Sequence, residues 1–277
     1  MILRAPAKLN LCLYLGPRRE DGLHELCSLT QPLTLSDRVV VTDAESDEVR
    51  CAEVEAPNLA ARALEGLRDR GWSRPPLRVE IEKRIPVAAG LGGGSADAAA
   101  VLRLARDEVA GIEELAAELG ADVPGQLGPG PALVRGAGER VEPLPPPPEY
   151  GLVLIPSADG LLTADVYAEA DRLGLGRDEA ELDAIGERLR DAAAGGSPLD
   201  YSELLANDLQ EAALSLQPDV GDALDALEAT GAARALVTGS GPTAFGLFGD
   251  VALADRAADS LPPRYADAIV AAPDTYR

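Results

Sequence analysis

The sequence predicts an α+β protein made of two domains. Three observations support this: a length of 277 residues, interleaved strands and helices without strict βαβα order, and a proline-rich stretch at 143–148. Hydrophobic residues make up 46% of the chain and aromatic residues only 3%, so the core must be largely aliphatic. The proline-rich stretch is the best candidate for a linker, which gives predicted domains 1–148 and 149–277.

Periodicity predicts the elements of the N-terminal domain. Apolar and β-branched runs are typical of strands, and residues 77–85 alternate between apolar and charged positions. Asn58 precedes apolar residues at helical spacing and fits an N-cap. The expected strands are 9–15, 25–35, 38–42 and 77–85, and the expected helices are 58–70, 95–109 and 112–119.

The same signals predict the elements of the C-terminal domain. Residues 152–155 have the composition of a buried strand, and two further apolar runs flank a Gly-Ser-Gly-Pro turn. The expected strands are 152–155, 235–238, 244–248 and 265–271, and the expected helices are 163–173, 179–193, 203–215, 219–229 and 250–260.

Charge and cysteine content restrict the partners and the compartment. The net charge of −22 argues against nucleic acid, whose phosphates are bound by Lys and Arg. Cys12, Cys27 and Cys51 lack metal-binding spacing and are expected to be reduced thiols in a cytoplasmic protein. We expect no signal peptide and no membrane span. Monomer and homodimer both remain open.

A glycine-rich loop between a predicted strand and a predicted helix is the strongest functional signal. Residues 86–95 read Pro-Val-Ala-Ala-Gly-Leu-Gly-Gly-Gly-Ser. Glycines allow close backbone approach, and a helix N-terminus offers free N–H groups and a positive dipole end, which together suit phosphates. An ordinary tight loop is the alternative. The loop has no Gly-Lys-Ser/Thr of a P-loop and is a poor dinucleotide fingerprint.

Rare residue types supply further candidates. Of the 25 basic residues only Lys8 and Lys83 are lysine, and His24 is the single histidine. Lys8 lies within an apolar strand, where a cation needs a partner or a cleft. Chance retention at the surface is the alternative for each lysine.

Two glycine-bounded turns complete the set of candidates. Asp122 lies in Gly-Ala-Asp-Val-Pro, which is equally consistent with an ordinary turn or N-cap aspartate. Residues 238–242 read Thr-Gly-Ser-Gly-Pro and join two predicted strands.

Together these segments resemble the GHMP kinase family, and within it the diphosphocytidyl-methylerythritol kinases. The order and spacing of the motifs near 5–10, 21–24, 58–63, 83–97, 120–124 and 238–242 all fit. Leu23 replaces a tyrosine of the family and Ala96 replaces a second serine. The stretch 170–205 matches poorly.

The resemblance implies a fold and a set of roles. The fold is the two-domain GHMP kinase fold, with a ribosomal S5 domain 2-like N-terminal domain and a ferredoxin-like C-terminal domain. Lys8 and Asp122 would be catalytic, and ATP would be bound as its Mg²⁺ complex, with the metal ligands unknown. The implied nucleotide-binding residues are Asn58, Lys83, Pro86, Ala89, Gly90, Leu91, Gly92, Gly93, Gly94, Ser95 and Ala96. The implied substrate-binding residues are Asn10, His24, Tyr167, Gly239, Ser240 and Gly241.

The implied reaction is phosphorylation of the 2-hydroxyl of a cytidine diphosphate-linked methylerythritol in isoprenoid precursor synthesis. Asp122 would accept the hydroxyl proton, and Lys8 would offset the developing charge. Asn58 fits an N-cap and Tyr167 a half-buried helix position equally well. A kinase for homoserine or mevalonate, or a non-catalytic nucleotide-binding protein, remains an alternative. An RNA-binding protein is disfavoured by the charge.

Overall fold

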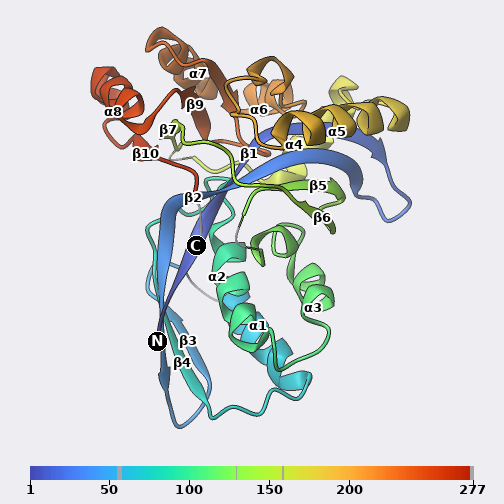
Figure 1. Ribbon diagram of the computed structural model, residues 1–277, viewed down its shortest axis with the longest axis vertical. Coiled ribbons are helices and arrows are strands. Elements are labelled where there is room, and N and C mark those ends of the chain that lie inside the picture. Colours follow the sequence, from blue (N-terminus) through green and yellow to red (C-terminus); the bar gives the residue numbers. More distant parts are fainter. Residues whose placement is uncertain (55–57, 129, 158, 275–277) are drawn as a thin grey trace. The chain divides into compact units, whose positions relative to one another are not determined.

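The computed structural model describes residues 1–277 except 55–57, 129, 158 and 275–277. The chain forms two compact units, each assembled from segments that are distant in the sequence (Figure 1). Unit 1 collects Met1–Lys8, Leu35–Val87 and Gly92–Pro129. Unit 2 collects Leu9–Thr34, Ala88–Leu91 and Gly130–Arg277.

These units do not follow the boundary predicted at the proline-rich stretch. The two long N-terminal strands, β1 (Ile2–Arg18) and β2 (His24–Asp43), each contribute residues to both units. The chain also passes from unit 2 to unit 1 within the glycine-rich loop, between Leu91 and Gly92. Amino-acid composition can reveal a linker when the chain passes from one domain to the next only once. It cannot reveal a boundary that falls within a continuous strand, as it does in β1 and β2. The division into 1–148 and 149–277 stays a prediction.

Unit 1 combines the second half of β2 with two further strands. Strand β4 (Leu77–Glu82) pairs antiparallel with β2, from Arg38 opposite Glu82 to Asp43 opposite Leu77. Strand β3 (Glu48–Cys51) adds to β4 in parallel orientation. The alternation predicted for 77–85 is confirmed, because Leu77, Val79 and Ile81 are buried.

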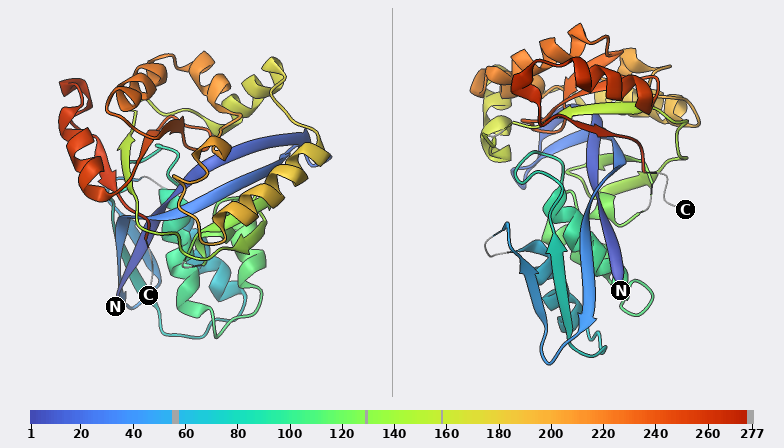
Figure 2. Two further views of the ribbon diagram at one scale, coloured as in Figure 1. Left: turned by 45° about the horizontal axis from the view of Figure 1, so that its top comes forward. Right: turned by 90° about the vertical axis from the view of Figure 1, so that its left-hand side faces the viewer.

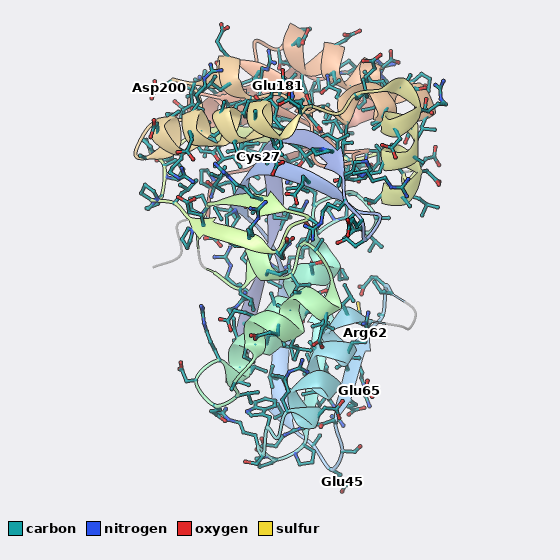
Figure 3. The ribbon with its side chains drawn as sticks, turned by 90° about the vertical axis from the view of Figure 1, so that its right-hand side faces the viewer. Cys27, Glu45, Arg62, Glu65, Glu181 and Asp200 are labelled. Carbon is teal, nitrogen blue, oxygen red and sulfur yellow. The ribbon has the colours of Figure 1, made fainter. Side chains whose placement is uncertain are left out.

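Three helices pack together in unit 1: α1 (Leu59–Asp69), α2 (Gly93–Leu102) and α3 (Ile112–Leu119). Helix α1 is amphipathic, since Ala60, Ala63, Leu64 and Leu67 are buried while Arg62 and Glu65 point outward (Figure 3). Helix α2 is buried over Ala96–Leu102, which explains its nearly uncharged sequence.

Unit 2 contains a four-stranded antiparallel sheet in the order β10-β7-β9-β8. One apolar core joins this sheet to helices α4, α6, α7 and α8, and Figure 2 shows helices on one face of it. The strands are β7 (Gly151–Ile155), β8 (Arg234–Val237), β9 (Ala244–Phe248) and β10 (Ile269–Ala271). The helices are α4 (Thr163–Leu173), α6 (Gln210–Leu216), α7 (Asp219–Ala229) and α8 (Val251–Ser260).

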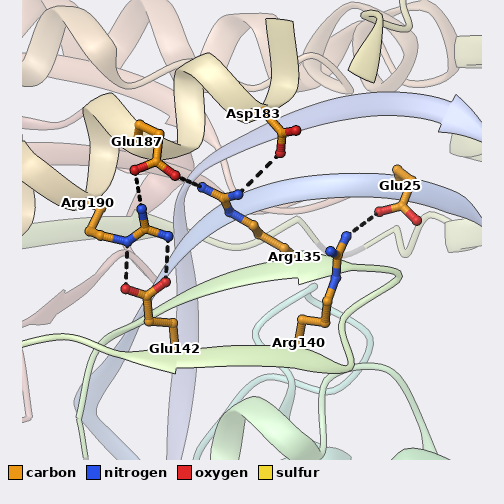
Figure 4. Close-up of polar contacts among 7 residues, drawn as sticks. All are labelled: Glu25, Arg135, Arg140, Glu142, Asp183, Glu187 and Arg190. Atoms are coloured by element: carbon orange, nitrogen blue, oxygen red, sulfur yellow. Dashed lines mark hydrogen bonds and ion pairs between the residues drawn. The ribbon is translucent and has the colours of Figure 1, made fainter. Parts of the chain in front are cut away.

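Helix α5 (Glu179–Ala193) is held on the hairpin of β5 (Ala132–Gly136) and β6 (Arg140–Pro143) by ion pairs (Figure 4). Arg190 binds both carboxylate oxygens of Glu142, at 2.6 and 2.8 Å, and its hydrogen bonds lower the pKa of that carboxyl group. Arg135 reaches Asp183 and Glu187 of α5. Gly186 leaves the space for the Arg135 guanidinium, because a Cβ there would overlap it.

Several predicted elements differ in the structure. The strand expected at 265–271 is β10, which begins only at Ile269, after a short 3₁₀ turn at Pro263–Tyr265. The strands expected at 25–35 and 38–42 form one strand, β2, because Asp37 is buried and accepts backbone hydrogen bonds that make it tolerable inside a strand. The helix expected at 95–109 begins at Gly93 and ends at Leu102, followed by a short 3₁₀ turn.

The helix expected at 203–215 is α6, which begins only at Gln210. The preceding residues are extended because they pair with β1: Leu13 N–H donates to Ala206 O, and Asp208 N–H donates to Leu13 O, both at 2.9 Å. Strands β3, β5 and β6 were not predicted, since they are short and lack clear alternation.

Two tyrosine substitutions should change stability in different directions. The Tyr150 side chain is fully buried, and its hydroxyl meets no hydrogen-bond partner among the described residues. Tyr150→Phe should therefore keep the free energy of unfolding or raise it by about 1 kcal/mol. Tyr14→Phe loses the hydrogen bond to Leu204 O and should lower it by about 1 kcal/mol. Urea unfolding measures both, and a clear loss in Tyr150→Phe would contradict the assignment.

Candidate active site

The half of the glycine-rich loop that belongs to unit 1 forms the start of α2. Gly92 is the N-cap residue with φ 67°, a left-handed conformation that favours glycine. The first helical backbone bond runs from Ala96 N–H to Gly92 O at 2.8 Å. The N–H groups of Gly93, Gly94 and Ser95 therefore have no intrahelical acceptor, and such a turn has the chemistry that suits an anion.

Lys8 lies beside this turn. A Cβ built on Gly92 would lie 2.8 Å from Lys8 Cγ, so only glycine allows the lysine to pass so close. Gln126 Nε2 donates to Gly92 O at 3.2 Å, and its side chain crowds the same Cβ position. The Lys8 residue is only 8% exposed, which fits the predicted need for a partner or a cleft.

The partner of Lys8 is Asp122. Lys8 Nζ lies 3.4 Å from Asp122 Oδ2, and the Asp122 side chain is about half exposed at 48%. Asp122 follows the end of α3, after Gly120. Unit 1 therefore brings together an ammonium group, an accessible carboxylate and a helix N-terminus from three distant segments. A carboxylate can accept a proton, and the ammonium and N–H groups can stabilise phosphate charge.

Lys83 is held more tightly than the sequence suggested. Its ammonium bonds to Asp37 Oδ2 and, at 2.9 Å, to Asp97 Oδ2. A Cβ on Gly93 would lie 3.1 Å from Lys83 Nζ, so this cluster lies directly against the first turn of α2. Asp37 Oδ1 also accepts the N–H groups of Arg84 and Ile85. These three side chains fix the end of β4 against the start of α2.

The cluster has one more carboxylate than ammonium, and burial raises the pKa of Asp97 to about 7 although Lys83 opposes this shift. Burial alone lowers the pKa of Lys83, but attraction by Asp97 and Asp37 outweighs it, so this pKa lies above its ordinary value. We conclude that Lys83 stays charged and that Asp97 is the group that takes up a proton.

Asn58 is confirmed as the N-cap of α1, with its Oδ1 accepting from Ala60 N–H at 2.8 Å. Gly94 faces Leu59 at the start of that helix, because a Cβ built on Gly94 would lie 3.7 Å from a Leu59 Cδ atom. Asn58 thus lies near the loop, and its contact with a nucleotide stays a prediction. Pro86 and Ala96 also belong to unit 1.

The remaining predicted site residues belong to unit 2. His24 Nε2 lies 2.8 Å from Asp171 Oδ1, and the His24 and Tyr167 ring centroids are 5.4 Å apart. Asn10 Nδ2 donates to Ser28 Oγ at 2.7 Å, and Asn10 N–H donates to Thr238 Oγ1 at 2.8 Å. These bonds anchor the Asn10 side chain and link β1 to the turn after β8.

The turn at 238–243 lies against the first half of the glycine-rich loop. Thr243 Oγ1 donates to Ala89 O at 2.6 Å, and a Cβ on Gly90 would lie 2.5 Å from Gly241 O. Leu91 is buried, and Ser240 Oγ lies 3.0 Å from Thr163 Oγ1. The C-terminal glycine turn therefore fixes the entry of the loop within unit 2.

Sequence reasoning found the residues at these sites only in part. The segment Asn207-Asp208-Leu209 resembles one of the family, and a helix N-cap explains it equally well. Asn207 Oδ1 accepts from Leu209 N–H at 3.0 Å, and its Nδ2 donates to the carbonyls of Val237 and Gly239, at 2.7 and 2.8 Å, and so holds the glycine turn. Asp208 accepts from Leu15 N–H and Arg177. Asp37 and Asp171 were missed. A lone acid between two apolar runs was the only available signal for Asp37, and Asp171 had none.

Comparison with known proteins identifies the family. The model of the GHMP kinases N terminal domain matches residues 58–132, and the model of the GHMP kinases C terminal domain matches residues 181–267. The chain therefore belongs to the GHMP kinase family, and the predicted family and fold class are confirmed.

Several individual proteins are similar to this chain over most of its length. The chain is 44% identical over 264 residues to the 4-diphosphocytidyl-2-C-methyl-D-erythritol kinase of Anaeromyxobacter dehalogenans, covering 90% of this chain and 80% of that one. It is 41% identical over 273 residues to the kinase of the same name from Streptomyces avermitilis, covering 94% and 91%. A crystal structure of 4-(cytidine 5'-diphospho)-2C-methyl-D-erythritol kinase matches both chains completely, with 34% identity and a TM-score of 0.82. Homoserine kinase from Cytophaga hutchinsonii shares the fold, with 18% identity and a TM-score of 0.72.

Substitution of Gly92 should damage turnover by displacing Lys8. Gly92→Ala places a Cβ against the side chains of Gln126 and Lys8, whereas Gly174→Ala has nearly the same φ, 72°, with no atom within 4 Å. Both changes should cost about 1 kcal/mol of stability from backbone strain. Only Gly92→Ala should lower kcat, by at least about tenfold, because it displaces Lys8, which is predicted to be catalytic, and a small misplacement of such a group is costly. Equal kcat in the two variants would show that Lys8 is not crowded by residue 92.

The Asp97 carboxyl should make stability depend on pH. Its pKa is about 7 in the folded chain and about 4 when unfolded, so its contribution is full below pH 4 and lost as pH rises through 7. The measured quantity is the difference between the unfolding free energies of the wild type and of Asp97→Asn. This difference should fall as the pH rises from 5 to 8, by up to about 1.4 kcal/mol per pH unit. Asp69→Asn, an exposed acid on α1, is the control. A difference independent of pH would contradict the shifted pKa.

Proposed function

We propose that this chain transfers the γ-phosphoryl group of ATP to the 2-hydroxyl of 4-diphosphocytidyl-2-C-methyl-D-erythritol. The observation that carries the proposal is the Lys8–Asp122 pair beside the N-terminus of α2 in unit 1. The acceptor is proposed from the relatives named 4-diphosphocytidyl-2-C-methyl-D-erythritol kinase, which match nearly the whole chain. A catalytically silent nucleotide-binding protein would not need the paired ammonium and carboxylate.

The chemistry follows from the groups present. The N–H groups of Gly93–Ser95 bind phosphate oxygens, and Lys8 stabilises the charge that develops on the transferred group. Asp122 accepts the proton of the attacking hydroxyl, and Lys8 Nζ lies 3.4 Å from its Oδ2. Positioning and electrostatics are the main contributions that a protein makes to phosphoryl transfer.

Mg²⁺ is proposed to arrive bound to ATP. Among the described residues no group of three or more His, Cys, Asp or Glu side chains could hold a metal ion. Mg²⁺ commonly keeps several water ligands and binds substrate phosphates with few protein ligands. Its role is to neutralise phosphate charge.

Within the described part of the chain, no helix has the length and apolar character that crossing a membrane requires.

A coupled assay of ADP release tests the function. Wild-type protein is supplied with MgATP and, in parallel, with the cytidyl substrate, homoserine or mevalonate, and release should occur with the cytidyl substrate. Asp122→Asn and Lys8→Met should each lower kcat by about 10²–10⁴, with KM for ATP changed only a few-fold. Glu113→Gln, which removes an exposed charge from α3, is the matched control.

The possible outcomes separate the alternatives. Release only with homoserine or mevalonate would overturn the acceptor assignment. Wild-type kcat in either site variant would remove that residue from the mechanism, and no release with any acceptor would favour a non-catalytic nucleotide-binding protein.

A further inference from the structure

Helix α4 fixes the position of the single histidine. Asp171 lies near the end of α4, and its Oδ1 is 2.8 Å from His24 Nε2 at the start of β2. The His24 side chain is 7% exposed and that of Asp171 is 43% exposed. Both residues belong to unit 2. The ring is therefore held by an acid that is itself accessible to solvent.

This bond determines which ring nitrogen carries hydrogen. A carboxylate only accepts hydrogen bonds, so His24 Nε2 must be the donor. In the neutral ring the other nitrogen, Nδ1, is then an acceptor. Nδ1 makes no hydrogen bond to any residue that the structure describes, and it is not among the polar atoms that are completely enclosed without a partner. It therefore keeps some exposed surface at which it can accept a hydrogen bond.

The same helix places an aromatic ring next to this acceptor. Tyr167 precedes Asp171 by one helical turn, so both project from one face of α4. The Tyr167 ring lies 5.4 Å from the His24 ring, at an interplanar angle of 39°. Leu23, next to His24, is 54% exposed and adds an apolar surface. A flat heterocycle that presents an N–H donor suits these surroundings.

We propose that Asp171 is a specificity-determining positioning residue for the base of the substrate. It holds His24 as the Nε2–H tautomer, so that Nδ1 accepts from an exocyclic amino group. Cytosine carries an amino group where uracil carries a carbonyl oxygen, and an acceptor facing that oxygen is left unpaired. The inference rests on the proposed function, because it assumes that the cytidyl end of the substrate lies at His24.

A purely structural ion pair is the competing explanation. In that case the ring would be doubly protonated, and Asp171 would only attach α4 to β2. Nδ1 would then be a donor and would favour the uracil carbonyl over the cytosine amino group. The two explanations therefore predict opposite base preferences.

The ring can be observed directly because the chain has one histidine. Protein labelled with ¹⁵N in histidine gives signals from His24 alone, which report the protonation of both nitrogens at pH 8. We expect a protonated Nε2 and an unprotonated Nδ1 in the wild type. Addition of cytidine 5′-monophosphate should shift the Nδ1 signal at lower concentration than uridine 5′-monophosphate does. A doubly protonated ring, an Nδ1–H tautomer or equal response to the two nucleotides would overturn the proposal.

Variants at position 171 separate positioning from folding. Asp171→Asn keeps a carbonyl oxygen that accepts from Nε2–H and should retain the preference within about threefold. Asp171→Leu has no acceptor and should lower the ratio of kcat/KM for the cytidyl over the uridyl substrate by about tenfold or more, mainly through KM. Asp165→Leu makes the same change at an exposed position of α4 and should keep the wild-type ratio. An unchanged ratio in Asp171→Leu would overturn the proposal.

The spectroscopic experiment distinguishes this inference from the proposed function. Nucleotide monophosphates bind without phosphoryl transfer, so the tautomer and the base preference are measured even if no acceptor is phosphorylated. Absence of ADP release together with the expected ¹⁵N result would contradict the proposed function and leave the role of Asp171 supported.

Discussion

The close approach of the Lys8 side chain to the backbone at Gly92 is the constraint on which the candidate site depends. A helix N-terminus binds anions weakly when it is open to water, and a lone lysine is a mobile charge. Here a left-handed glycine lets the lysine stem pass within van der Waals distance of the turn. The ammonium then reaches Asp122, and the lysine stem lies against the first turn of α2. Three weak features become one preorganised arrangement.

A buried charge cluster of Lys83, Asp37 and Asp97 lies against the same first turn of α2. Removing three ionised groups from water is expensive unless each finds partners. Lys83 bonds two carboxylates, and Asp37 also binds two backbone N–H groups, which offsets part of the desolvation cost. At Asp97 burial prevails and raises the pKa of the carboxyl group to about 7. Asp97 Oδ1 has no hydrogen-bond partner among the described residues, so the proton can reside on this oxygen. The contacts of Lys83 with both carboxylates give it a role in holding the loop that nucleotide contact alone would not require.

Most of the fold of unit 1 and the helices of unit 2 could be predicted because their signals are local. Asn58 caps a helix through Ala60, and residues 77–82 alternate within one strand. The missed features are of another kind. Asp171 meets His24 across 147 residues, Asp37 meets Ile85 across 48, and Asn207 meets Gly239 across 32. Their roles arise only after the chain has folded, so no local pattern could reveal them.

The glycine-rich loop shows why local reading still found the site. Its two halves belong to different units, and each half depends on glycine for a different reason. Gly90 approaches the carbonyl of Gly241, whereas Gly92 approaches the side chain of Lys8. Both positions exclude a Cβ sterically, in addition to requiring positive φ. In this loop a cluster of glycines therefore reflects close packing against neighbouring residues. This explains why the sequence identified the loop but not the partners that hold it.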